Sequence, residues 1–268
     1  IRLHAGVNID MNIGNGTMLS STENLSFAPS PNVTFEWHMM DNLFHLYANA
    51  QGYYGIGSLQ EYLGYNRYLD IPQGVAWNTP RTYTPVDAQI GFKIRPLPTL
   101  LLDVYGGYAY MSDAYNMYAS VDSVKVTNYE LFLTDYHRWK VGASLHYHLR
   151  DIVELNVDGN YYFWRTAADA VVYDRPNWDL KARVDVHIDS KWSLYSDNYF
   201  AGSRTAFTSE GEKTLRPTIA LNIGCSYAVN RWLLAYVQLN DYLHRKNDIL
   251  YGYQAQGCHF LLGIKYKF

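Results

Sequence analysis

Hydrophobic and polar residues alternate with a period of two along most of the chain, and helical periodicity is nearly absent. Residues 178–189 show the pattern most clearly: six apolar side chains from Trp178 to Ile188 interleave with six charged or ionisable ones from Asp179 to Asp189. Successive side chains of a strand point to opposite faces. A fully polar face opposite a fully apolar one is required where a closed barrel stands in lipid, with the apolar side outside.

The same pattern recurs along the chain and predicts an all-β fold, a 12-stranded antiparallel transmembrane β-barrel forming one domain over 1–268. The predicted strands are 1–10, 32–40, 43–55, 85–95, 100–112, 136–149, 152–164, 177–189, 192–203, 218–229, 232–243 and 259–268. An even number is typical of bacterial single-chain barrels. Because the first residues already alternate like a strand, we expect that a leader was removed or that an upstream region is missing.

The connections between these strands alternate between short and long. Short turns fall at 41–42, 96–99, 150–151, 190–191 and 230–231, and long segments at 11–31, 56–84, 113–135, 165–176, 204–217 and 244–258. Aromatic residues of the apolar face gather at the strand ends, with Trp37 and Trp192 near short turns and Trp139 and Trp178 near long segments. Short periplasmic turns, long outer loops and two aromatic girdles indicate the outer membrane of a Gram-negative bacterium.

Composition narrows the function classes. Charged residues make up 18% of the chain, below the ~25% usual in soluble domains. The net charge of −3 provides no basic footprint for nucleic acid. No run of 18 apolar residues offers a membrane helix. Cys258 is predicted to lie near a long loop and Cys225 to face lipid on a non-adjacent strand, so we expect no disulfide between them.

Several short motifs carry a resemblance. Tyr266-Lys267-Phe268 resembles the terminal aromatic signal by which outer-membrane proteins are recognised for barrel insertion. The segments Asp174-Arg175-Pro176, Gly202-Ser203-Arg204 and Leu239-Asn240-Asp241 are similar to the C-terminal barrel region of TonB-dependent-receptor-like proteins of Bacteroidota. The resemblance covers roughly 95–268 and implies an outer-membrane receptor or transporter, with Phe268 as assembly signal.

The chain departs from that family in two respects. Full receptors have 22 strands and an N-terminal plug, and neither fits in 268 residues. No TonB-box-like segment is visible. The resemblance therefore implies a smaller, plugless relative.

The inward face of the predicted barrel carries charges of both signs. Its candidate lumen-lining residues are Arg138, Lys140, Glu154, Asp158, Asp179, Lys181, Arg183, Asp185, His187 and Lys265. An ion-selective pore more often shows one dominant sign, so this lining indicates either a weakly selective polar channel or a lumen closed by ion pairs. Eight strands leave a filled interior and 16–18 leave a channel, so a count of twelve leaves both open.

The longest predicted loop, 56–84, is rich in aromatic residues. Tyr62, Tyr65, Tyr68 and Trp77 could fold into the barrel mouth as a cap, or could present a surface for a ligand or partner. Both interpretations stay open at this point.

Catalytic and metal-binding patterns are weak. Asp185 and His187 share a strand face in the manner of an outer-membrane protease pair, but they lie beside a predicted periplasmic turn rather than at the outer rim. His146 and His148 share a face and are expected to be polar lining rather than metal ligands. We therefore expect no enzyme, no metal and no cofactor.

Two functional hypotheses follow. The first is a porin-like or receptor-like channel for a polar small molecule or peptide. The second is a closed structural barrel that anchors a periplasmic domain or serves as a subunit of an envelope complex. Both hypotheses imply contact with outer-membrane lipid. The second also implies contact with other envelope proteins.

Overall fold

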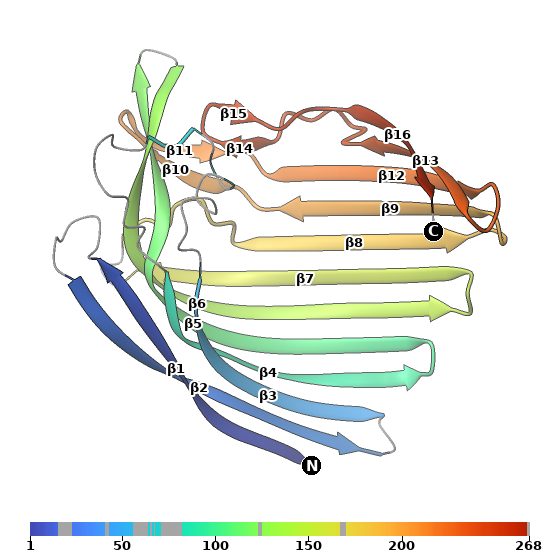
Figure 1. Cartoon of the computed structure of the whole chain (residues 1–268), viewed down its shortest axis with the longest axis horizontal. Helices are drawn as coiled ribbons and strands as arrows, with labels where there is room; N and C mark the ends of the chain where they lie inside the picture. Colours follow the sequence, from blue (N-terminus) through green and yellow to red (C-terminus); the bar gives the residue numbers. More distant parts are fainter. Residues whose placement is uncertain are drawn as a thin grey trace.

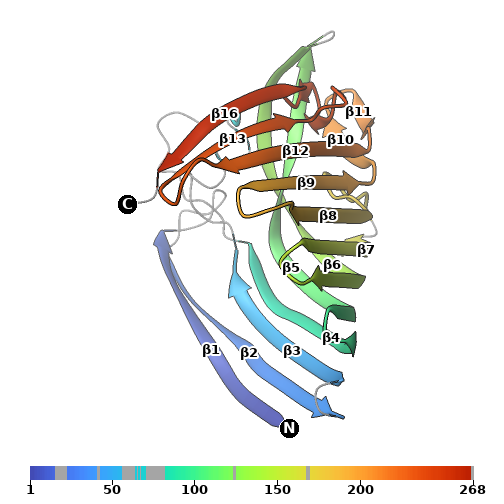
Figure 2. The same ribbon diagram turned by 90° about the vertical axis from the view of Figure 1, so that its right-hand side faces the viewer.

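In the computed structural model the chain forms one large, strongly curved antiparallel sheet (Figures 1 and 2). The structure describes residues 1–15, 23–40, 43–55, 64, 66, 68–70, 82–122, 125–166 and 170–266, and at 11–15 and 23–27 only the backbone. The elements with described bounds are all β-strands. No helix in this part of the chain is long and apolar enough to cross a membrane.

Twelve strands follow one another along the continuous path of the sheet. They are β1 (Arg2–Asn15), β2 (Glu23–Met39), β3 (Phe44–Tyr54), β4 (Tyr83–Leu97), β5 (Leu100–Asp122), β6 (Lys125–Leu149), β7 (Val153–Thr166), β8 (Trp178–His187), β9 (Trp192–Ala201), β12 (Thr218–Ala228), β13 (Leu233–Asn240) and β16 (His259–Tyr266). Each predicted strand corresponds to one of them. The period-two pattern therefore located the wall of the sheet correctly.

The sheet is open in the described part of the chain, so the closed barrel predicted from the sequence is not observed. There, β1 pairs only with β2, and β16 pairs only with β13. Alternation assigns side chains to faces, but it does not say whether the first and last strands meet. Closure depends on curvature and stagger, which the sequence pattern does not encode.

Short connections gather at one end of the strands, on the right in Figure 1. They join β4 to β5, β6 to β7, β8 to β9 and β12 to β13. Local polar caps build two of these turns: Asp189 accepts hydrogen bonds from the backbone N–H groups of Lys191 and Trp192, and Asn230 from those of Trp232 and Leu233. Such side-chain acceptors favour tight turns. The residues 41–42 lie outside the described part of the chain.

The predicted long loops contain more strand than expected. β1 and β2 continue to Asn15 and from Glu23, and β5 and β6 continue as paired strands over 113–122 and 125–135. A bulge between Met111 and Ala114, with Asp113 at φ 53°, bends this hairpin. Further strands are β10 (Arg204–Thr208), β11 (Gly211–Leu215), β14 (Asp248–Leu250) and β15 (Tyr253–Gln254).

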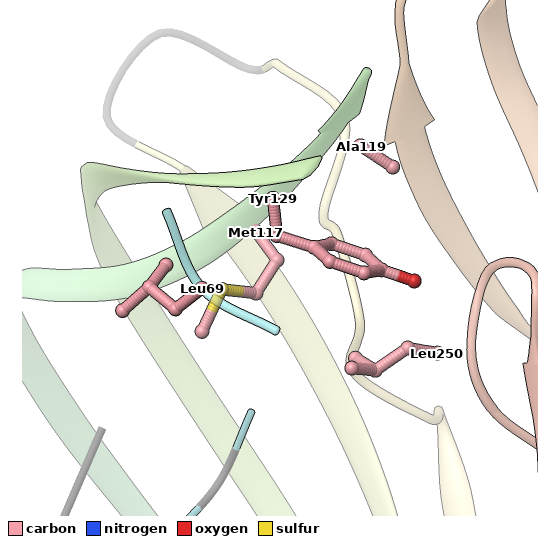
Figure 3. Close-up of a cluster of buried hydrophobic side chains, with 5 residues drawn as sticks. All are labelled: Leu69, Met117, Ala119, Tyr129 and Leu250. Carbon is pink, nitrogen blue, oxygen red and sulfur yellow. The ribbon is translucent and has the colours of Figure 1, made fainter. Parts of the chain in front are cut away.

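The largest hydrophobic core of the described residues lies among these extensions rather than in the wall. Strand β10 pairs with the free edge of β5 at Tyr118, and Leu69 bridges the other edge of the hairpin at Tyr129. We call this assembly the cap: residues 68–70, the hairpin residues 112–122 and 125–133, Tyr173–Pro176 and 204–254 beyond the wall strands. Its buried core is Leu69, Met117, Ala119, Tyr129 and Leu250 (Figure 3).

Candidate functional site: the polar face of the sheet

The two faces of the wall differ sharply in chemistry. On one face large apolar side chains are open to the surroundings, with Leu262 71% and Ile264 72% exposed. Trp37, Trp192 and Trp232 lie on this face near the short turns, and Trp139, Phe163 and Trp178 lie toward the cap. An exposed apolar surface of this extent is not stable in water and marks contact with lipid or another protein.

The opposite face carries several groups of hydrogen-bonded side chains between β3 and β9, which together we call the polar network. Its members reach over small residues to the strand beyond their neighbour. Arg138 on β6 binds Asp87 on β4 at 3.3 Å, across the fully buried Ala109 of β5. Lys140 donates to Gln89 at 2.9 Å across Gly107. Small residues on the middle strand thus let long side chains span three strands.

Tyrosine rings use glycines in the same way. The Tyr47 ring lies over Gly91 and its hydroxyl donates to the Asp103 carboxylate, 3.0 Å away. The Tyr105 ring lies over Gly142 and its hydroxyl donates to Asn160 Oδ1 at 2.7 Å. Strand glycines permit this close approach because they lack a Cβ.

Tyr195 and Tyr236 repeat the arrangement over Gly224 and Gly263. Four ring-over-glycine contacts therefore pin neighbouring strands of the wall.

Most predicted lumen residues belong to this network or flank it. Asp158 accepts from Asn160 at 2.9 Å, and Asp179 accepts from Asn160 and from the Tyr162 hydroxyl. Arg183 forms a two-point contact with Asp185, at 2.7 and 2.9 Å, and approaches Asp197 at 3.5 Å. Glu154 accepts from Asn156.

Lys181 lines a depression of about 370 Å³ together with His146, Asp158, Arg183 and Asp197. Lys265 lies apart from the network on β16, beside Trp232 and Tyr266. The depression is open to solvent, and its lining offers hydrogen-bond donors and acceptors and charges of both signs. This combination suits a small polar solute.

Ion pairing within the described residues runs along the wall. Arg138 on β6 pairs with Asp87 on β4, and Arg183 pairs with Asp185 on its own strand. The stagger of the strands decides these partners. Among the described residues, no ion pair extends from one end of the sheet to the other across the hollow.

The protease-like pair has other partners. Asp185 is held by Arg183, while His187 Nδ1 lies 2.8 Å from the Ser193 hydroxyl oxygen at the short-turn end. The carboxylate therefore does not orient the imidazole as a catalytic pair would require.

The cap gathers aromatic residues from distant loops. Tyr68 stacks on Tyr253 with ring centroids 4.0 Å apart, and the Tyr129 hydroxyl donates to the Tyr251 carbonyl. Of the four predicted loop residues, Tyr68 is therefore in the cap, while Tyr62, Tyr65 and Trp77 lie outside the described residues. Phe268 also lies outside them.

Sequence reasoning missed two charged groups that organise the cap. Arg175 lies over the rings of Tyr136 and Trp164, and its Nη2 donates to the Tyr115 carbonyl at 3.2 Å. Burial raises the pKa of the neighbouring Asp174 to about 6, and the charges of Arg204 and Arg175 partly oppose this shift. The Asp174-Arg175-Pro176 motif was visible in the sequence, but its burial was not.

The fold places the chain beside outer-membrane receptors and transporters. It is similar to "Copper transporter OprC" (TM-score 0.65, 11% identity, covering 94% of this chain and 41% of that one). It is also similar to the ferric-catecholate import receptor Fiu of E. coli K12 (TM-score 0.63, 14% identity, covering 93% of this chain and 36% of that one). A third similar structure is that of the pyoverdine outer-membrane receptor FpvA of Pseudomonas aeruginosa PAO1 (TM-score 0.62, 12% identity, covering 92% of this chain and 36% of that one).

No protein-family model and no curated protein sequence matches the chain. The neighbours are receptor barrels of the TonB-dependent type, so the predicted resemblance holds at the level of the fold. At 11–14% identity this likeness shows the fold alone, and the chain spans about two fifths of those proteins' length.

Proposed function

We propose that this chain forms part or all of the wall of an outer-membrane channel or receptor for a polar solute. The observation that carries the proposal is the contrast between the faces: an exposed apolar face with aromatic residues at both ends, and a polar face with several groups of hydrogen-bonded side chains. Lipid on the apolar side and water on the polar side account for both. The apolar face then contacts the membrane, and the predicted lining residues face the lumen.

The likeness to receptor barrels supports the transport side of this proposal. Nearly the whole chain superimposes on about two fifths of a larger barrel, so its curvature is that of a wide cylinder. In lipid the unpaired edges of β1 and β16 must be satisfied by further strands or by each other. In a wide cylinder the lateral ion pairs leave the centre free for a solute.

The finer expectations stay proposals. They are a porin-like pore, a single domain over 1–268 and a relationship to proteins of Bacteroidota. A non-enzymatic role is supported by neighbours whose names describe receptors and transporters.

Planar-bilayer recording of the purified full-length protein tests the proposal. We expect single-channel steps that persist in Asp185→Asn, because the Arg183–Asp185 pair runs along the wall and does not block the lumen. Absence of conductance, together with absence of solute-dependent fluorescence change at Tyr105 and its neighbours, would favour the structural anchor instead.

A further inference from the structure

A cluster of three metal-ligating side chains lies at the short-turn end of the polar face. His38 on β2 and His45 on β3 are directly opposite each other, and Glu36 lies two residues before His38 on the same face. One ligand atom from each lies within 4.8 Å of the others. Among the described residues, no hydrogen bond joins the cluster to the polar network between β3 and β9.

Two members of the cluster, His45 and Glu36, hold polar atoms without a hydrogen bond among the described residues. The Nε2 atom of His45 is buried and has no hydrogen-bond partner among the described residues. Leaving such an atom unpaired costs free energy. The Glu36 carboxylate has Arg2 at 4.0 Å and His38 at 3.7 Å, both longer than a hydrogen bond. Two imidazoles stacked with centroids 4.0 Å apart add no compensating donor.

We propose that Glu36, His38 and His45 bind a divalent transition-metal ion of the zinc and copper class. Two imidazole nitrogens and one carboxylate oxygen form a ligand set that such ions prefer over Ca²⁺ or Mg²⁺. Metal–ligand bonds of about 2.0–2.2 Å require ligand atoms closer than those observed, so modest side-chain rotations bring the ligands together. Solvent reaches the site, with the His38 side chain 40% and that of Glu36 31% exposed, and water completes the coordination.

The neighbouring charges make the site selective for a strongly bound ion. Lys93 lies 5.0 Å from the centroid of the Tyr47 ring, and the His45 ring is 5.9 Å from that same ring. Arg2 and Lys93 repel a weakly held cation such as Mg²⁺, whereas imidazole coordination overcomes that repulsion. Arg2, with an 84% exposed side chain, is free to move away from Glu36 when the ion enters.

The full chain in detergent provides the test, with heat-modifiable migration as the check of folding. Isothermal titration with Zn²⁺ should show one site, and His38→Gln/His45→Gln should weaken it at least about a hundredfold. The matched control His146→Gln/His148→Gln removes another imidazole pair of the polar face and should leave the affinity unchanged. Ca²⁺ and Mg²⁺ should give no heat of binding.

Two further measurements keep the proposal falsifiable if the double variant fails to fold. Electron paramagnetic resonance of Cu²⁺ on the wild-type protein should show coupling to two imidazole nitrogens. The near-isosteric Glu36→Gln should weaken Zn²⁺ binding about tenfold. No stoichiometric binding, coupling to fewer than two imidazoles, or equal affinity in all variants would overturn the site, whether or not the protein conducts.

Discussion

Adding a single methyl group at Gly142 should destabilise the wall selectively. A Cβ at this position would lie 2.6 Å from Cζ of Tyr105 and 2.6 Å from Oδ1 of Asn160, closer than real Cβ contacts allow. The ring must move, which costs about 1–3 kcal/mol by overpacking. The Tyr105 hydroxyl would also lose its bonds to Asn160 and Asp158, about 1 kcal/mol more. We therefore expect Gly142→Ala to lower the free energy of unfolding by about 2–4 kcal/mol.

Gly106 on the same wall is the matched control. A Cβ there would meet nothing nearer than the Lys140 carbonyl oxygen at 3.7 Å, so Gly106→Ala should change stability by less than about 0.5 kcal/mol. Urea titration of the protein in lipid vesicles, followed by tryptophan fluorescence, measures both. In a Tyr105→Ala background the Gly142→Ala penalty should fall, because the ring is gone and only the Asn160 side chain still meets the new Cβ. Equal effects at Gly142 and Gly106, or an undiminished penalty in the double variant, would refute the ring-over-glycine argument.

The remaining predictions concern the membrane face, the cap and assembly. Val184→Arg places a charge on the apolar face and should lower the free energy of unfolding in vesicles by about 2–4 kcal/mol. Arg183→Gln removes only half-exposed ion pairs and should lower it by less than about 1 kcal/mol. Similar losses for the two variants would show that the faces are misassigned. Asp174 has a folded pKa of about 6 against an ordinary 3.8, so its contribution to cap stability is complete below pH 3.8 and is lost as the pH rises through 6. This amounts to about 3 kcal/mol, and hydrogen exchange of the cap between pH 4.5 and 7.5 should show a pH dependence that Asp174→Asn abolishes; an unchanged profile would contradict the buried protonation. Deleting Phe268 should lower barrel assembly in cells and barely alter the stability of refolded protein, and normal assembly would remove the terminal-signal hypothesis.

The wall of the sheet was predictable because its two faces meet different surroundings. Residues such as Val184 and Arg183 alternate strictly, so the spans of β8 and β9 could be read to within two residues at each end. The distal part of β5 lacks this signal. Asn116 and Met117 are adjacent and both buried, because cap segments pack on both sides of the hairpin. A strand covered on both faces does not alternate, and it was taken for a loop.

The candidate sites were predictable only in part, because a face assignment does not provide a register. The sequence places Arg138 and Asp87 on the polar face, but only the stagger of β4, β5 and β6 brings them together across Ala109. The same limit applies to the proposed metal site, because the contact between its two imidazoles depends on the direct pairing of His38 with His45 across β2 and β3. Glycines on the polar face were one available signal, since Gly91, Gly142, Gly224 and Gly263 each lie under a tyrosine ring of the neighbouring strand.

The cap hairpin has a consequence for the order in which the protein folds. Segments from both directions along the chain contact the hairpin: Leu69 precedes it, and Phe207 and Tyr251 follow by roughly a hundred residues. The wall grows from neighbouring hairpins, whereas these contacts close long loops and therefore form slowly. Until residues 204–254 are synthesised and folded, the cap part of the hairpin has unpaired backbone edges that strands of other chains can pair with. We therefore expect the cap to fold last and to be the part of the nascent chain that most needs protection from wrong association.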